Sequence, residues 1–325
     1  MIVGAIEGGG TKFVCAVLQF DHPNIPEKTP RILRIERIPT TDPEPTLDAV
    51  VRFFKDSEIE CVGLGMFGPI ECRIESPLWG YLLKTPKPGW SDIDIAQRLQ
   101  RKLGVPIKLE TDVAAAGLGE WKWGAGLGTH CCVYITIGTG IGAGIIIDGI
   151  PMRASFHPEI GHMRVPRART ADSGPDEFKG LCIHHGDCLE GLASGPAIAA
   201  RWGEAPENMS IEHPAWKLEA EYLAYALTNI ALTVAPDRII VGGGIGLREG
   251  LLDLISERMR ELLGGYIQAL NSTAAIRLFL ARAELGSKAG VLGAAELARQ
   301  TINSVSSVSN RLYTFGKSRS SKNQG

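Results

Sequence analysis

Short apolar runs separated by glycine-rich turns form a pattern that occurs twice along the chain. Residues 2–6 and 13–20 are apolar runs of strand length that flank the turn EGGGTK. Residues 130–137 and 143–147 repeat this arrangement around the turn GTGIG. Each pair opens a stretch in which strand-like and helical periodicities alternate, so the pattern predicts an internally duplicated α/β protein with two lobes.

The other elements follow from apolar periodicity and from capping residues. Further strands are predicted at residues 31–38, 61–67, 105–109, 238–241 and 275–283. Helices are predicted at residues 46–57, 91–103, 113–121, 216–235, 248–263 and 287–300. We expect a small lobe at residues 1–118, completed by the helix at 287–300, and a larger lobe at residues 119–286. Serine, asparagine, lysine and arginine dominate afterwards, which predicts a disordered tail at residues 301–325.

Composition excludes several classes of protein. With 325 residues, 44% hydrophobic and 22% charged, the chain has an ordinary globular balance. Its net charge of -2 argues against a nucleic-acid partner, and no apolar run is long enough to span a membrane. The amino terminus lacks a secretory signal pattern, and the seven cysteines include the adjacent Cys131 and Cys132 inside an apolar strand. These features predict a cytoplasmic protein with reduced thiols.

Cysteine and histidine concentrate in the segments HPEIGH and CIHHGDCLEGLASGP. Cys182, His185 and Cys188 stand at three-residue spacing, and His162 lies one loop upstream. Two thiolates and two imidazoles complete a tetrahedral zinc shell, so we predict a structural zinc site. The alternative is a loop with buried cysteines and a solvated histidine pair. The adjacent His184 leaves open which histidine closes the site.

Carboxylates flank this metal segment and also follow an earlier strand. Glu159 and Glu190 bracket the segment, and with His162 they would suit a ligand rich in hydroxyl groups. The alternative for both acids is an exposed position on a surface loop. Asp112 follows a predicted strand and opens a helix, where it could act chemically or serve only as an N-cap.

Three glycine-rich turns suggest an anionic ligand. The turn at residues 8–12 offers converging N–H groups, a hydroxyl and an ammonium group, although it could also be a simple β-turn. The turn at residues 138–142 repeats it, and Gly242–Gly244 follow a strand and precede a helix. Gly63, Gly65 and Gly68 fit the dinucleotide pattern, but Pro69 stands where a helix would have to begin, so we expect a ligand-facing loop instead. A nucleoside triphosphate bound by turns from both halves of the chain explains the three turns together.

The motifs EGGGTKF, ETDVAAAGLGE, ITIGTGIGAG, HPEIGH and CIHHGDCLEGLASGP occur in the order found in the ROK sugar kinases. The chain resembles this family over residues 1 to about 300, and it is most similar to the bacterial-type ROK fructokinases. The resemblance implies a duplicated actin/hexokinase-like (ribonuclease H-like) fold, a homodimer, ATP and Mg²⁺ for catalysis, and a structural Zn²⁺. It also implies transfer of the γ-phosphoryl group of ATP to the 6-hydroxyl of a hexose, here D-fructose.

The resemblance also implies roles for individual residues, with Asp112 as the catalytic base. The residues matching the family's ATP and phosphate site are Gly9, Gly10, Thr11, Lys12, Gly138, Thr139, Gly140, Pro196, Gly242, Gly243 and Gly244. The residues matching its sugar site are Gly68, Pro69, Thr111, Asp112, Glu159, His162 and Glu190. The residues matching its zinc ligands are His162, Cys182, His185 and Cys188.

Two departures and three alternatives accompany this resemblance. Glu7 replaces the aspartate of most members, although the fructokinase branch shares glutamate, and Ala114 replaces a common asparagine. The alternatives are a kinase for glucose, mannose or an N-acyl amino sugar, a sugar-sensing repressor, and an inactive zinc-stabilised scaffold. A repressor would carry a helix-turn-helix ahead of the first hairpin, where only residues 1–6 stand; Asp112 and the three turns argue against a scaffold.

Overall fold

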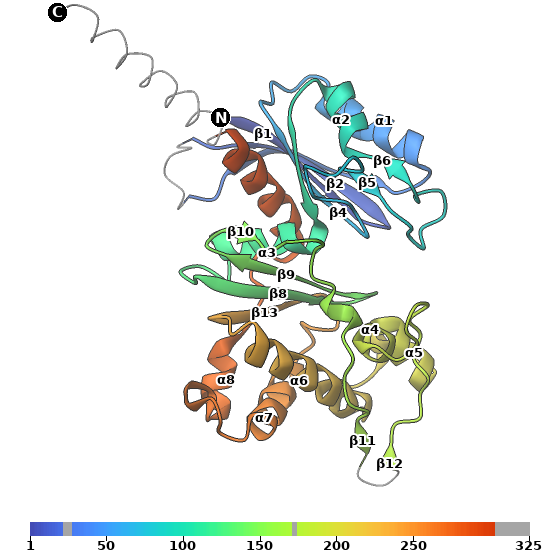
Figure 1. Ribbon diagram of the computed structural model, residues 1–325, viewed down its shortest axis with the longest axis vertical. Helices are drawn as coiled ribbons and strands as arrows, with labels where there is room; N and C mark the ends of the chain where they lie inside the picture. The colour runs from blue at the N-terminus through green and yellow to red at the C-terminus, as the bar shows by residue number, and fades with distance from the viewer. Residues whose placement is uncertain (22–27, 171–173, 303–325) are drawn as a thin grey trace, which may run out of the picture. The chain divides into compact units, whose positions relative to one another are not determined.

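The computed structural model describes residues 1–21, 28–170 and 174–302 (Figure 1). The predicted tail at residues 301–325 therefore lies almost wholly outside the described residues. The chain divides into two compact units, Met1–Ala115 together with the segment that begins at Gly290, and Ala116–Ala289.

The first unit is built on a five-stranded sheet of order β3-β2-β1-β4-β7. Its strands are β1 (Ile2–Gly8), β2 (Lys12–Gln19), β3 (Arg31–Pro39), β4 (Val62–Met66) and β7 (Ile107–Thr111). The hairpin β1–β2 is antiparallel, whereas β1, β4 and β7 run parallel to one another. The helix at residues 289–302 packs directly on β4, because a Cβ at Gly63 would lie 1.7 Å from the Ala294 carbonyl oxygen.

The second unit repeats this sheet with the order β10-β9-β8-β13-β14. Its strands are β8 (Cys131–Ile137), β9 (Ile141–Ile147), β10 (Ile150–Pro151), β13 (Arg238–Gly242) and β14 (Leu280–Arg282). Again a hairpin, β8–β9, is antiparallel, and β13 is parallel to both β8 and β14. The same strand order and the same directions in both units confirm the predicted duplicated α/β fold.

Helices cover the two sheets. They are α1 (Pro43–Phe54), α2 (Ala96–Leu103), α3 (Asp112–Trp123), α4 (Leu189–Ala193), α5 (Gly195–Trp202), α6 (Ala215–Thr233), α7 (Leu251–Leu263) and α8 (Thr273–Phe279). Short strand pairs are formed by β5 (Tyr81–Leu82) with β6 (Ile93–Asp94) and by β11 (Arg169–Thr170) with β12 (Gly174–Pro175). In the described residues no helix combines the length and the apolar character that a membrane crossing requires.

Among the predicted elements that were wrong in type or extent, two differ for a clear reason. The strand predicted at residues 275–283 is helix α8 followed by the short strand β14, because Ser272 Oγ accepts the Ala275 N–H at 3.1 Å and caps the helix. Helix α2 begins at Ala96 and not at residue 91, because Ile93–Asp94 pair with Tyr81–Leu82 as strand β6. Its predicted end is correct, since Gly104 adopts a left-handed φ of 70° after Leu103.

Candidate functional site

In the first unit, three parallel strands end at one edge of the sheet. Glu7 of β1 pairs with Gly65 of β4, and Met66 of β4 pairs with Thr111 of β7. The carboxyl ends of parallel strands carry the residues that follow them to a common edge. The register therefore brings the first glycine turn, the Gly68–Pro69 loop and Asp112 to the same edge.

Glu7 has an unusual electrostatic environment. Its pKa is raised from 4.5 to about 7, chiefly by burial and also by the neighbouring Asp112 charge, while Lys12 and Arg37 oppose the rise. The Glu7 carboxyl packs against the backbone of Gly290, where a Cβ would lie 2.4 Å from the Glu7 Cδ. Two interacting carboxylates beside a glycine turn are a donor set that fits a hard divalent cation such as Mg²⁺.

Asp112 is the first residue of helix α3, but the residue that caps this helix is Thr111. The Thr111 hydroxyl accepts the Ala114 N–H at 3.2 Å, which is the N-cap interaction, whereas Asp112 Oδ1 accepts the adjacent Val113 N–H at 2.8 Å. Helix capping alone therefore does not account for an acid at position 112.

The turn between β1 and β2 is closed by a hydrogen bond from the Gly9 N–H to the Lys12 carbonyl oxygen at 2.9 Å. Thr40 holds it from the side, because its hydroxyl donates to the Gly9 carbonyl oxygen at 2.8 Å. Gly10, Thr11 and Lys12 are exposed, and apart from the adjacent residues no atom of the described chain lies within 4 Å of a Cβ built at Gly10. The turn therefore has room for a ligand atom close to its backbone.

The second unit gathers the predicted metal ligands. One ligand atom each from His162, Cys182, His185 and Cys188 lies within 4.8 Å of the other three. The Cys182 Sγ lies 3.7 Å from His162 Nδ1 and 3.6 Å from His185 Nδ1, and the Cys188 Sγ lies 3.6 Å from His162 Nδ1. A tetrahedral zinc ion with its usual bond lengths would separate sulfur and nitrogen by about 3.6 Å. The four side chains fit Zn²⁺.

A tight backbone hairpin brings these ligands together. Cys182 and Gly186 exchange two backbone hydrogen bonds of 3.1 and 2.8 Å, and Gly186 has a φ of 66°. His185 is thereby turned toward His162, with ring centroids 5.0 Å apart, against 6.4 Å for His184. The geometry selects His185 of the two adjacent histidines.

The two predicted sugar carboxylates occupy different environments. Glu190, on α4, accepts the Ile141 N–H at 2.9 Å, so it is attached to the turn at residues 138–142. Glu159 is about half exposed and interacts with His157 Nε2 at 2.8 Å. The link between Glu190 and the turn could not be read from sequence, because 49 residues separate the two partners.

A cavity of about 810 Å³ lies in the second unit. From the predicted phosphate set, Gly138, Thr139, Pro196 and Gly244 line it. Gly242 and Gly243 do not line the cavity; a Cβ there would lie 2.6 Å from Tyr134 Oη and 2.2 Å from the Ile137 carbonyl oxygen. Helix α7 begins at Leu251 and not directly after these glycines, so the expected anion-binding helix start is not found there. A cavity of this size suits a nucleotide.

A different helix begins at the cavity. The Gly195 N–H, at the start of α5, donates to the Gly138 carbonyl oxygen at 2.7 Å, which places the amino end of α5 beside the glycine turn. Helix amino ends and glycine backbones both favour anions, so this wall of the cavity suits phosphate groups.

The cavity also has a wall that sequence analysis missed. The Arg248 guanidinium carbon lies 3.9 Å from the centre of the Trp216 ring, and Arg248 donates to the carbonyl oxygens of Pro206 and Met209. The Trp216 indole N–H donates to the Ser210 carbonyl oxygen at 2.7 Å. Arg248 and Trp216 line the cavity themselves, and their hydrogen bonds hold the segment that contributes Pro206 and Glu207 to its lining. Arg248 carried no sequence signal, because it was placed inside a predicted helix.

Comparison with known proteins finds relatives that match nearly the whole chain. The chain is 38% identical over 302 residues to a putative fructokinase of Bacillus subtilis, covering 93% of this chain and 96% of the relative. It is 39% identical over 305 residues to a fructokinase of Zymomonas mobilis, covering 91% and 96%. The fold matches a ROK hexokinase of Thermus thermophilus with a TM-score of 0.74 and 26% identity, covering 94% of this chain and 100% of that one.

A second solved structure is a ROK family glucokinase of Streptomyces griseus in complex with glucose and AMPPNP. It has a TM-score of 0.65 and 26% identity, and the match covers 92% of this chain and 100% of that one. The sequence model of the ROK family matches residues 3–301. The chain belongs to the ROK family.

Proposed function

We propose that this protein is an ATP-dependent fructokinase that transfers the γ-phosphoryl group of ATP to the 6-hydroxyl of D-fructose. One observation carries the proposal most directly. The turn at residues 138–142 lines the cavity of nucleotide size through Gly138 and Thr139, and it holds the carboxylate of Glu190 through Ile141. A single turn thus connects a phosphate-binding surface with a group suited to sugar hydroxyls.

In this proposal the nucleotide occupies the cavity of the second unit. The N–H groups of Thr139 and Gly140 would bind phosphate oxygens there, next to the amino end of α5. The family resemblance also assigns phosphate binding to the turn at Gly9–Lys12, which offers a hydroxyl and an ammonium group. The AMPPNP bound to the Streptomyces griseus glucokinase supports ATP as the donor. Mg²⁺, held near Glu7, would neutralise charge on the phosphoryl oxygens.

Glu159, His162 and Glu190 would bind the sugar hydroxyls, with Gly68 and Pro69 as a loop facing the sugar. Nδ1 is the His162 nitrogen close to both sulfur atoms, so Nε2 is the one that can meet a hydroxyl. The zinc shell is complete with four side chains, so its role is structural: it fixes the loop that carries the sugar ligands.

Asp112 would accept the proton of the 6-hydroxyl as that oxygen attacks the γ-phosphorus. A positioned general base contributes about 10²–10⁴-fold to such a reaction.

A cytoplasmic location is supported by the cysteines, since all seven lie in the described residues and none forms a disulfide. A homodimer remains a prediction from the family resemblance.

The test is a kinetic comparison of sugars with MgATP. Purified protein is assayed with D-fructose, D-glucose, D-mannose and N-acetylmannosamine, and kcat/KM is compared. The proposal expects fructose to give the highest value by at least about 10-fold, the difference that roughly one or two hydrogen bonds produce. A higher kcat/KM for another sugar would assign a different hexose kinase, and no turnover with any sugar would refute a kinase function.

A further inference from the structure

Three of the four metal-site residues stand on one loop, from Phe178 to Gly191, in the second unit. Its backbone is tied by the Leu181 N–H, which donates to the Gly191 carbonyl oxygen at 2.9 Å, and by the Cys182–Gly186 pair. These bonds close the inner part of the loop. They do not fix its entry at Phe178 to the segment that carries His185 and Cys188.

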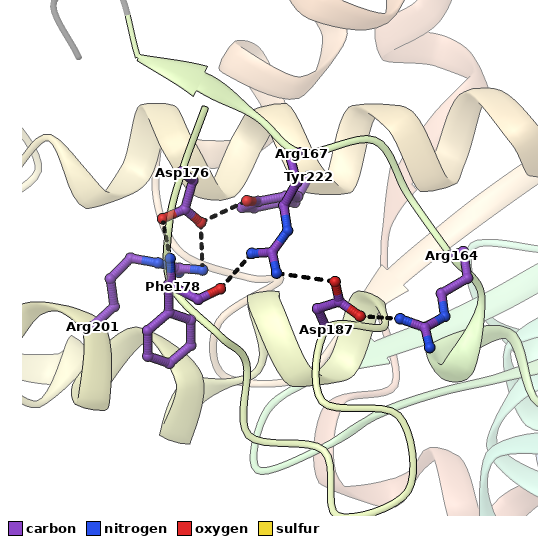
Figure 2. Close-up of polar contacts among 7 residues, drawn as sticks. All are labelled: Arg164, Arg167, Asp176, Phe178, Asp187, Arg201 and Tyr222. Atoms are coloured by element: carbon purple, nitrogen blue, oxygen red, sulfur yellow. Dashed lines mark hydrogen bonds and ion pairs between the residues drawn. The ribbon is translucent and has the colours of Figure 1, made fainter. Parts of the chain in front are cut away.

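The Arg167 side chain makes that connection (Figure 2). One terminal nitrogen of Arg167 donates to the Phe178 carbonyl oxygen, and the other donates to Asp187 Oδ2 at 2.9 Å. Asp187 stands between the ligands His185 and Cys188. The planar fork of one guanidinium group therefore bridges the entry of the loop and the residue beside two metal ligands.

The entry of the loop is itself firmly held. The Phe178 N–H donates to Asp176 Oδ1 at 3.1 Å, and the Arg201 guanidinium carbon lies 4.4 Å from the centre of the Phe178 ring. Asp176 Oδ2 receives the Arg201 guanidinium at 3.1 Å and the Tyr222 hydroxyl at 2.6 Å. Arg201 and Asp176 are largely buried, with side chains 9% and 10% exposed. Phe178 is thus held by residues of helices α5 and α6, and Arg167 links Asp187 to Phe178 by a hydrogen bond to each.

We propose that Arg167 is a positioning residue for the metal site: it holds Asp187, and with it His185 and Cys188, at the spacing that the ion requires. The bridge uses only protein groups, so it orders the loop before metal arrives. Ligands held in place lose less entropy on binding an ion. The consequence for sugar binding rests on the proposed function, whereas the consequence for metal affinity does not.

The chain supplies a matched control in Arg164. It also forms an ion pair with Asp187, through Oδ1, but its side chain is 61% exposed, against 32% for Arg167. In the contacts drawn in Figure 2, Arg164 reaches Asp187 alone, and Arg167 reaches both Asp187 and Phe178. Arg164→Met and Arg167→Met each remove one positive charge that pairs with the Asp187 carboxylate. Only Arg167→Met also removes the bridge between Asp187 and Phe178.

The experiment measures zinc affinity of the full-length protein by competition with a chelator. We expect Arg167→Met to weaken zinc binding about 10- to 100-fold, the range found when the groups that orient metal ligands are removed. Arg164→Met should stay within about 3-fold of wild type, because an exposed ion pair contributes little. Arg167→Lys keeps the charge without the fork, so it should resemble Arg167→Met. Asp187→Asn tests the same bridge from its other end.

Two further readouts separate positioning from general destabilisation. The absorption spectrum of the Co²⁺-substituted protein should change in Arg167→Met and Arg167→Lys but not in Arg164→Met, since it reports the geometry around the ion. KM for fructose should rise about 10-fold in Arg167→Met, while KM for ATP stays within about 2-fold.

The proposal is overturned if the Arg164 and Arg167 variants have equal zinc affinities, or if Arg167→Lys binds zinc like wild type. An equal rise in both KM values with an unchanged cobalt spectrum would also overturn it. If wild type phosphorylates no sugar, the proposed function fails, but the zinc and cobalt measurements still decide the role of Arg167.

Discussion

Glu7 offers a quantitative test of the electrostatics at the strand edge of the first unit. Its pKa rises from 4.5 to about 7 in the folded protein, because burial and the Asp112 charge disfavour the ionised carboxylate. The folded state then binds more protons than the unfolded state between these two values. The contribution of Glu7 to stability is therefore fully present below pH 4.5 and is lost as the pH rises through about 7.

The magnitude follows from the size of that pKa difference. Each pKa unit corresponds to about 1.4 kcal/mol, so the change from 4.5 to about 7 costs about 3 kcal/mol at pH 8. The same calculation gives a cost of about 1 kcal/mol at pH 5. Glutamine has nearly the same shape but does not ionise. We therefore expect Glu7→Gln to be more stable than wild type at pH 8 and to lose most of this advantage at pH 5.

The assay is urea unfolding of both proteins at pH 5, 6, 7 and 8 in buffer without magnesium or nucleotide. Glu58→Gln, which replaces an exposed acid of the same unit, serves as the control. The difference in unfolding free energy between this variant and wild type should change little with pH. We expect Glu7→Gln to lose activity despite its greater stability, because it removes a proposed ligand of Mg²⁺. A stability difference between Glu7→Gln and wild type that is independent of pH, or that favours wild type at pH 8, would refute the reasoning.

Two further predictions address the second unit. Wild type should contain about one zinc per chain by elemental analysis, and Cys182→Ser should lose both the metal and measurable sugar binding; a wild type without zinc would contradict the loop structure. Arg248→Met should raise KM for ATP about 10-fold and leave KM for fructose within about 2-fold, because Arg248 holds the Pro206 and Met209 carbonyl oxygens at the cavity wall. Arg260→Met, at an exposed position on helix α7, is the control, and an equal effect of both variants would contradict the role of Arg248.

Local patterns in the sequence predicted the fold where each element carries its own signal. The two apolar hairpins predicted β1–β2 and β8–β9, and the repeated arrangement predicted the duplicated topology that the structure confirms. The strand predicted at residues 275–283 was wrong because apolar spacing alone does not separate a short helix from a strand. Ser272 was the available signal, since serine is typical of the N-cap position, where its hydroxyl can accept an N–H from the first turn, here that of Ala275.

The candidate site could be predicted only where its residues are close in sequence. Cys182, His185 and Cys188 share one spacing pattern, and the structure brings them together with His162. The choice between His184 and His185 needed the hairpin at Gly186, which spacing does not reveal. The Arg248–Trp216 stack and the Arg167 bridge to Asp187 join residues that are far apart in the sequence. Such contacts depend on tertiary packing, so no local pattern indicates them.

The central claim is the transfer of a phosphoryl group to one hydroxyl of fructose with Asp112 as the base. The most direct test incubates D-fructose with MgATP and identifies the product by phosphorus and carbon NMR, for wild type and for Asp112→Asn. We predict fructose 6-phosphate with wild type and a rate lower by about 10²–10⁴-fold with Asp112→Asn, which keeps its fold. A product phosphorylated elsewhere, or an Asp112→Asn rate equal to that of wild type, would contradict the account.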